Sequence, residues 1–153
     1  MSVRILNEMR LDFPAIAENE GFARVVVSGF MLPLNPTVET LADVKTAVSE
    51  AVTNAIIHGY GGERGTVRLH GVYTTEGLLY IDVIDKGRGM ADVELARQPF
   101  FTTAEGEDRS GMGFTVMESF MDQVEVKSAV GEGTTVPLIK RVELRDEALP
   151  RRA

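Results

Sequence analysis

Apolar and polar residues alternate along the first segment of the chain, residues 3–13, which is typical of a β-strand with one buried face. From residue 14 to about residue 30 the apolar positions are three or four residues apart instead, so we expect a helix there. Pro14 suits the first turn of that helix. Two prolines and an asparagine between residues 33 and 36 then predict a loop.

The longest helical pattern covers residues 38–58. Its apolar residues form one stripe at three- and four-residue steps, namely Leu41, Val44, Val48, Ala51, Val52 and Ala55. We expect Thr37 or Asn35 to cap the N-terminus of this helix, because both side chains accept hydrogen bonds from free backbone N–H groups. Gly59 is expected to end the helix.

An antiparallel pair of strands is predicted next, at residues 66–75 and 78–85, joined by a Glu-Gly turn. The second of these runs is nearly all apolar, as expected for a central strand. Residues 90–108 are polar, acidic and interrupted by a proline. A stretch of this length without a clear pattern predicts a long loop outside the core, either functional or disordered.

A short helix is predicted at residues 113–121, with Phe120 among its inward residues, and two further strands at residues 123–127 and 134–140. Pro137 lies within the last strand. Because proline cannot donate to a sheet ladder, that strand is expected at an edge or to be locally bent. The order of elements predicts an α/β (α+β) two-layer sandwich, with one mixed, mostly antiparallel sheet and helices on one face.

Composition and charge narrow the class of protein. A chain of 153 residues suits one domain, which we place at residues 1–144, followed by a charged tail at residues 145–153. The absence of cysteine excludes a thiol nucleophile and a thiolate metal site. We find neither a signal-like N-terminus nor a membrane span, and expect a cytoplasmic protein without a membrane partner. The net charge of −7 argues against direct nucleic-acid binding and favours a basic protein partner.

Three clusters of residues are candidates for chemistry, and the first lies on the long helix. Glu50 and Asn54 are four residues apart and share one side of the helix with Ala47 and His58, largely opposite the apolar stripe. That side could be an ordinary solvated polar face. It could also combine a carboxylate that accepts a proton with an amide oxygen that holds a hard cation.

The second cluster is Asp85, Gly87 and Gly89, directly after the predicted central strand. The glycines would let the backbone lie flat against a planar ligand while the carboxylate accepts from its amino group, although an ordinary turn has the same composition. The third cluster is residues 110–114, just before a predicted helix. Free amide groups and the helix dipole favour phosphate there, but a flexible hinge fits as well, and no Walker loop is present.

The order of these clusters resembles the GHKL group of ATP-binding proteins, whose boxes have the forms E-x-x-x-N, D-x-G-x-G and G-x-G. The stretches SEAVTNAIIHGY, IDVIDKGRGM, PFFTT and RSGMGFTVMESFMD narrow the resemblance to bacterial anti-sigma factors that are serine-protein kinases, with the sporulation branch closest. The resemblance extends over about residues 1–142. It implies the GHKL (Bergerat) fold, ATP or ADP as the nucleotide, and Mg²⁺ as the metal.

The resemblance also implies a role for each residue of the three clusters. Glu50 would be the general base, Asn54 would bind Mg²⁺, and Asp85 would accept from the adenine amino group. Arg109, in a lid at about residues 91–110, would reach the γ-phosphate, or it could merely pair with a nearby lid carboxylate. The remaining residues expected at the nucleotide are Gly87, Gly89, Ser110, Gly111, Met112, Gly113, Phe114 and Thr134.

By the same resemblance the protein would be a homodimer, formed through its sheet, that binds and inhibits a sporulation sigma factor of the sigma-F type. It would use ATP to phosphorylate a serine of its STAS-type anti-anti-sigma antagonist. Three alternatives stay open: a general-stress anti-sigma kinase of the same family, a detached histidine-kinase-type ATPase domain, and a nucleotide-gated binding module. We expect neither His58 nor His70 to be a phosphoacceptor, because the helical hairpin that carries one in histidine kinases is missing.

Overall fold

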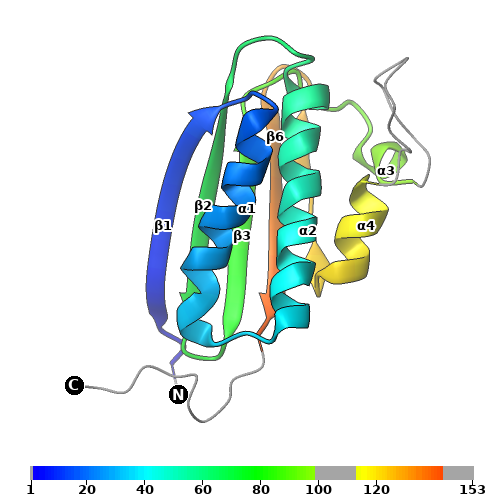
Figure 1. Cartoon of the computed structure of the whole chain (residues 1–153). Helices are drawn as coiled ribbons and strands as arrows, with labels where there is room; N and C mark the ends of the chain where they lie inside the picture. Colours follow the sequence, from blue (N-terminus) through cyan, green and yellow to red (C-terminus); the bar gives the residue numbers. More distant parts are fainter. Residues whose placement is uncertain (1, 99–112, 143–153) are drawn as a thin grey trace.

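One layer of the molecule is a six-stranded sheet, and its helices cover one face of it (Figure 1). This computed structural model describes residues 2–98 and 113–142. The strands are β1 (Ile5–Pro14), β2 (Thr66–Thr74), β3 (Leu78–Asp85), β4 (Gln123–Val124), β5 (Lys127–Ala129) and β6 (Gly133–Arg141). The helices are α1 (Glu18–Met31), α2 (Val38–Asn54), α3 (Val93–Ala96) and α4 (Gly113–Phe120), with a 3₁₀ turn η1 (Leu32–Leu34) and a π-turn η2 (Ala55–Gly59).

The strands lie in the order β1-β2-β3-β6-β4, and β5 also pairs with β6. Every pair among the described strands is antiparallel, so the expected two-layer sandwich is confirmed with an antiparallel rather than a mixed sheet. In β3 every second residue is buried, as a strand with one covered face requires. Leu79, Ile81 and Val83 therefore face the helices, whereas Tyr80 and Asp82 lie on the outer face.

Helix α2 forms the centre of the helical layer, and its sequence explains its position. Thr37 is the N-cap, since its side chain accepts a hydrogen bond from the N–H of Thr40 (3.0 Å). The predicted apolar stripe is buried except for Leu41, which is half-buried, but Ala47 is fully buried too, although we placed it on the polar side. The reason is that α2 packs against α1 and also against α4, so two of its sides are covered.

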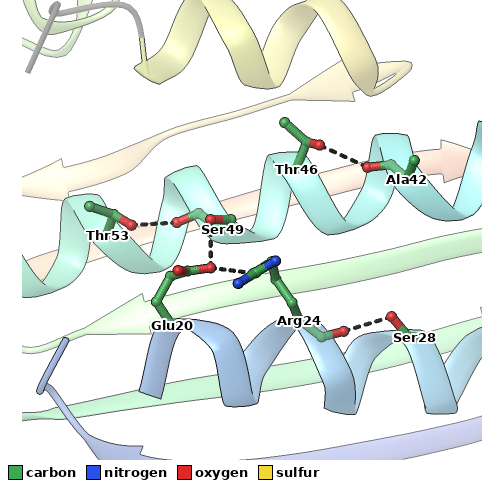
Figure 2. A network of polar contacts seen from close by, with 7 residues as sticks. All are labelled: Glu20, Arg24, Ser28, Ala42, Thr46, Ser49 and Thr53. Atoms are coloured by element: carbon green, nitrogen blue, oxygen red, sulfur yellow. Dashed lines mark hydrogen bonds and ion pairs between the residues drawn. The ribbon is translucent and has the colours of Figure 1, made fainter. Parts of the chain in front are cut away.

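Polar side chains join α1 to α2 beside this packing (Figure 2). One carboxylate oxygen of Glu20 accepts hydrogen bonds from Arg24 Nε (2.5 Å), on its own helix, and from Ser49 Oγ (2.7 Å) on α2. Thr53 donates to the backbone carbonyl of Ser49 (2.7 Å), one turn back. These contacts fix α2 against α1 at the residue that precedes Glu50.

Two expectations about local structure were wrong. Pro14 is the last residue of β1, opposite Thr66, and α1 begins only at Glu18. Proline is tolerated there because β1 is an edge strand, where one row of N–H groups needs no partner. Phe120, expected to face inward, is 37% exposed, whereas Phe114 and Met117 of the same helix are buried.

Pro137 lies inside the sheet rather than at its edge. On one side β6 pairs with β3 along residues 134–141, and on the other it pairs first with β5 and then with β4. The carbonyl of Pro137 accepts from the N–H of Glu125 (3.0 Å), in the gap between those two short strands. The missing proline N–H is thus accommodated by a local break in the ladder, which is the second of the two predicted possibilities.

None of the described helices combines the length and the apolar character needed to cross a membrane.

Candidate nucleotide-binding site

A cavity of about 330 Å³ opens where the C-terminal half of α2, the ends of β3 and β6, α3 and the start of α4 meet. Six of the residues predicted from the sequence line it: Asn54, Asp85, Gly89, Gly113, Phe114 and Thr134. Described members of all three sequence clusters, each ambiguous alone, are therefore brought to one place by the fold, although Glu50 is not among the residues that line the cavity. Gly87 lies behind the cavity wall, in a groove on the other side of the same loop.

Asp85 ends strand β3 and is only 6% exposed. Its Oδ1 accepts from the N–H of Gly87 (2.9 Å), and the N–H of Thr134, opposite it on β6, also donates to the carboxyl group. Burial raises the pKa of Asp85 above its usual range, and the two backbone hydrogen bonds offset part of that rise. These hydrogen bonds hold the carboxyl group in one orientation in the wall of the cavity.

The glycine loop, residues 85–89, has no room for side chains at its two glycines. A Cβ atom on Gly87 would lie 2.0 Å from the carbonyl oxygen of Gly59, and one on Gly89 would lie 2.0 Å from that of Ala129. Gly89 also has a positive φ of 72°, which side chains disfavour. The loop is therefore pressed between the end of α2 and the β5–β6 hairpin, more tightly than an ordinary turn requires.

Arg88, between the two glycines, fastens the loop on both sides. Its N–H donates to the carbonyl of Gly59 (2.9 Å), and its own carbonyl accepts from the N–H of Gly131 (2.8 Å). Its Nε donates to the carbonyl of His58 (2.6 Å) at the end of α2. Arg88 and His58 both line the cavity, although the sequence analysis gave neither a nucleotide-site role. The only signal in the sequence was that they lie next to residues of the first and second clusters.

At the other end of the cavity, α4 begins directly against the polar residues of α2. A Cβ atom on Gly113 would lie 3.0 Å from Asn54 Nδ2, 3.3 Å from Asn54 Oδ1 and 3.4 Å from Glu50 Oε2. Glu50 and Asn54 are half-buried, so this side of α2 is not the solvated face that the spacing alone allowed. A carboxylate, an amide oxygen and the N-terminus of an eight-residue helix converge there.

These side chains fit a magnesium ion that is shared with phosphate groups. The described residues hold no cluster of three or more histidine, aspartate or glutamate side chains able to bind a metal alone. Magnesium is usually held by one or two protein oxygens and completed by phosphate oxygens and water. The amide oxygen of Asn54, beside Gly113 and Glu50, would be a ligand of that kind.

Thr134, which is 7% exposed, belongs to a hydroxyl cluster in the cavity wall, beside Asp85. Its Oγ1 lies 2.8 Å from Ser128 Oγ, which in turn accepts from the N–H of Met90 (2.8 Å). The residue after the glycine loop is thereby tied to the β5–β6 hairpin. Ser128 could not be singled out from sequence, because an isolated serine in a short strand carries no distinguishing pattern.

The opposite wall is built by α3, whose Leu95 and Ala96 line the cavity. Arg97, next in the chain, donates to the carbonyl of Val124 (3.0 Å) and pairs with Glu118 of α4. The other predicted site residues, Arg109, Ser110, Gly111 and Met112, lie outside the described residues. So do residues 99–110 of the predicted lid and the predicted tail.

Comparison with known proteins decides the family. Residues 13–140 match the model of the histidine kinase-like ATPase domain. The chain is 52% identical to the anti-sigma F factor of Geobacillus thermodenitrificans over 136 residues. These aligned residues make up 89% of this chain and 93% of that protein. The chain belongs to the family of anti-sigma F factors.

Other anti-sigma F factors are similarly close. The anti-sigma F factor of Geobacillus stearothermophilus is 53% identical over 134 residues, which are 88% of this chain and 92% of that protein. The one from Thermoanaerobacter pseudethanolicus is 50% identical over 136 residues, covering 89% and 94%. The family resemblance noted from the sequence is thus confirmed, and it favours the sporulation branch over the general-stress one.

Solved structures add the fold. The crystal structure of the RsbU and RsbW domains of a Mycobacterium tuberculosis protein matches with a TM-score of 0.66 at 20% identity, over 89% of this chain and 32% of that one. The mycobacterial sensor histidine kinase MprB matches with a TM-score of 0.57 at 16% identity, over 91% of this chain and 100% of that one. At such identities the matches show the ATPase fold alone, which confirms the predicted fold class.

Proposed function

We propose that this anti-sigma F factor binds ATP in the cavity and transfers its γ-phosphate to a serine of an anti-anti-sigma protein. The observation that supports this proposal most is that the two ends of one cavity are lined by residues of different chemistry. A buried carboxylate and a glycine loop lie at one end, and Asn54 and the start of α4 lie at the other, where Glu50 is next to Gly113 although it does not line the cavity itself. The first suits a base with an amino group, and the second suits phosphates.

At the adenine end, the carboxyl group of Asp85 accepts from the exocyclic amino group, and Thr134 adds a hydroxyl beside it. The backbone of the glycine loop lies along the base at Gly89, which lines the cavity. Side chains at Gly87 and Gly89 would collide with carbonyls of the protein itself, so the loop could not keep this position with other residues there. These contacts bind ATP and ADP equally. They therefore set affinity for the nucleotide rather than the rate of transfer.

At the phosphate end, Mg²⁺ supplies charge neutralisation when bound, and Asn54 would hold it. Glu50 accepts the proton of the attacking serine hydroxyl while the serine oxygen bonds to the γ-phosphorus and the bond to the β–γ bridging oxygen breaks, leaving ADP. Positioning and charge neutralisation provide most of the rate in such transfers. Among residues outside the described part, we propose Arg109 at the γ-phosphate, and Ser110, Gly111 and Met112 as backbone donors to the phosphates.

The proposed partners are a sigma-F-type sigma factor, which the names of the relatives indicate, and an STAS-type antagonist as the kinase substrate. We further propose a cytoplasmic homodimer that forms through the outer face of the sheet. Half-buried Tyr80, Ile84 and Ile139 lie on that face, and no described helix covers it. The net charge of −7 suits a partner with a basic surface.

Transfer of ³²P from γ-labelled ATP to a purified serine-bearing antagonist tests the proposal. We expect an acid-stable phosphoserine on the antagonist that depends on Mg²⁺. An acid-labile label would favour a histidine-kinase-type reaction instead. ATP and sigma-factor binding without any transfer would favour a nucleotide-gated binding module.

A further inference from the structure

Tyr60 follows the π-turn that ends α2, and this turn decides where its side chain goes. The N–H of Tyr60 donates to the carbonyl of Ala55, five residues back (3.1 Å). A turn of this kind contains one more residue than an α-helical turn, so the residues after it are rotated relative to the helix. The ring packs against Gly65, where a Cβ atom would lie 2.3 Å from Tyr60 Cε1. Tyr60 therefore lies outside the cavity, over the beginning of β2.

The hydroxyl of Tyr60 lies between the ends of two paired strands. It donates to the carbonyl of Thr66 (2.6 Å) and accepts from the N–H of Lys86 (2.7 Å). In the β2–β3 register Val67 is opposite Asp85, so Thr66 and Lys86 are the next facing pair. The hydroxyl thus occupies the place of a direct ladder bond between them.

An inserted hydroxyl keeps the two backbones further apart than a direct N–H···O bond would. The chain leaves the sheet at this point, because Lys86 follows Asp85 and precedes Gly87. We infer that Tyr60 is a positioning residue for the nucleotide site: its hydroxyl separates β2 from β3 at Lys86 and sets the direction of the glycine loop. The inference rests on the proposed function, in that ATP is the nucleotide whose base the loop contacts.

This role differs measurably from a purely structural one. A tyrosine that only stabilised the fold would, on losing its hydroxyl, lower the free energy of unfolding and leave nucleotide affinity unchanged. A tyrosine that aims the loop affects contacts to the base, which are made equally before and during phosphoryl transfer. Loss of such uniform binding raises KM for ATP and leaves kcat unchanged.

The test is Tyr60→Phe in the full-length chain, with ATP affinity measured by calorimetry and kcat and KM by phosphorylation of the antagonist. We expect the Kd and KM for ATP to rise roughly threefold to tenfold, the range that one hydrogen bond contributes, with kcat nearly unchanged. Tyr73→Phe is the matched control. It removes a hydroxyl that accepts from Asn7 Nδ2 (3.2 Å) at the opposite end of β2, and ATP affinity should not change.

Gly65→Ala probes the same hydroxyl by a second route, because the added methyl group displaces the ring without removing the oxygen. We expect it to weaken ATP binding in the same direction. The double variant should lose little more than the stronger single variant, since both act through one contact. Additive losses would contradict the shared route.

An unchanged ATP affinity in Tyr60→Phe would overturn the inference while leaving the proposed function intact. So would a fall in unfolding temperature without any fall in affinity, or an equal loss of affinity in Tyr73→Phe. If the wild-type chain itself did not bind ATP, the proposed function would fail, and this inference with it.

Discussion

The outer surface of β1 and β2 and the floor of the cavity hold their carboxylates in opposite ways. On the surface, Asp12 is exposed and accepts two hydrogen bonds from Arg68 (2.6 and 3.0 Å), which keep the pKa of Asp12 below its usual range. In the cavity, Asp85 is buried, its protein donors are the N–H groups of Gly87 and Thr134, and burial raises its pKa.

The difference shows which carboxylate is arranged for a ligand. The charge of Asp12 is already matched by an arginine, and an exposed pair of this kind contributes little to stability. The charge of Asp85 is kept in a poorly solvated place without such a match. A donor arriving from outside, such as an amino group, would relieve that cost, so binding energy is available at Asp85 that Asp12 cannot provide.

The largest effect should come from Glu50, the carboxylate beside Gly113 that we assign to proton transfer. Glu50→Gln keeps the size of the side chain but removes its basicity, so phosphoryl transfer should fall by roughly 10²- to 10⁴-fold, while ATP binding persists. Single-turnover transfer of labelled phosphate measures this. Glu39→Gln, in the first turn of the same helix, is the control and should leave transfer unchanged. Normal transfer by Glu50→Gln would exclude Glu50 as the general base.

A smaller loss is expected at the carboxylate on which the comparison turns. Asp85→Asn replaces a carboxylate oxygen, which accepts a hydrogen bond, by an amide NH₂ group, which donates one. Two donors would then face each other at the adenine amino group, so ATP affinity should fall roughly 10- to 100-fold. Calorimetric titration with ATP and ADP should show the same factor for both nucleotides. Asp12→Asn, an identical change on the surface, should leave both affinities as they are. A loss confined to ATP would place Asp85 at the phosphates instead.

The smallest effect concerns the free energy of unfolding. Its change with pH should have opposite signs for Asp85 and Asp12. Because its folded-state pKa is raised, Asp85 contributes stability below its unfolded pKa of about 3.9, and that contribution is lost as pH rises through the folded value. Asp12, whose pKa is lowered, contributes above about pH 3.9 and loses the contribution as pH falls. Urea unfolding of wild type, Asp85→Asn and Asp12→Asn between acid and neutral pH measures both differences. If both substitutions changed the pH dependence of the unfolding free energy in the same direction, the opposite pKa shifts of Asp85 and Asp12 would be contradicted.

Local chemistry determined what the sequence could predict of this fold. The stripe of α2 and the alternation of β3 follow from contacts within a few residues and were found, and the cap was narrowed to Thr37 or Asn35. Ala47 and Pro14 were misplaced because their environments depend on partners distant in sequence: α2 packs against both α1 and α4, and β2 pairs with the strand that Pro14 ends.

The site was predictable to the same extent. Asn54, Asp85, Gly89 and Gly113 belong to clusters that each had an ordinary explanation as well, and only the order of the clusters and the family resemblance marked them, together with Thr134, as site residues. The fold brings all five to one cavity. Tyr60 could not be found in this way. Its role depends on a π-turn and on the strand register, and neither leaves a recognisable pattern in the residues themselves.

The break in the ladder at Pro137 has a mechanical consequence. Both short strands pair with the same side of β6. Strand β5 belongs to the hairpin that contacts Gly89, and β4 follows the end of α4, whose first residue lies next to Asn54. Pro137 lies between the stretches of β6 that pair with the two short strands, so each short strand is anchored separately. The hairpin beside Gly89 and the helix beside Asn54 are thus supported by one strand at two separate places.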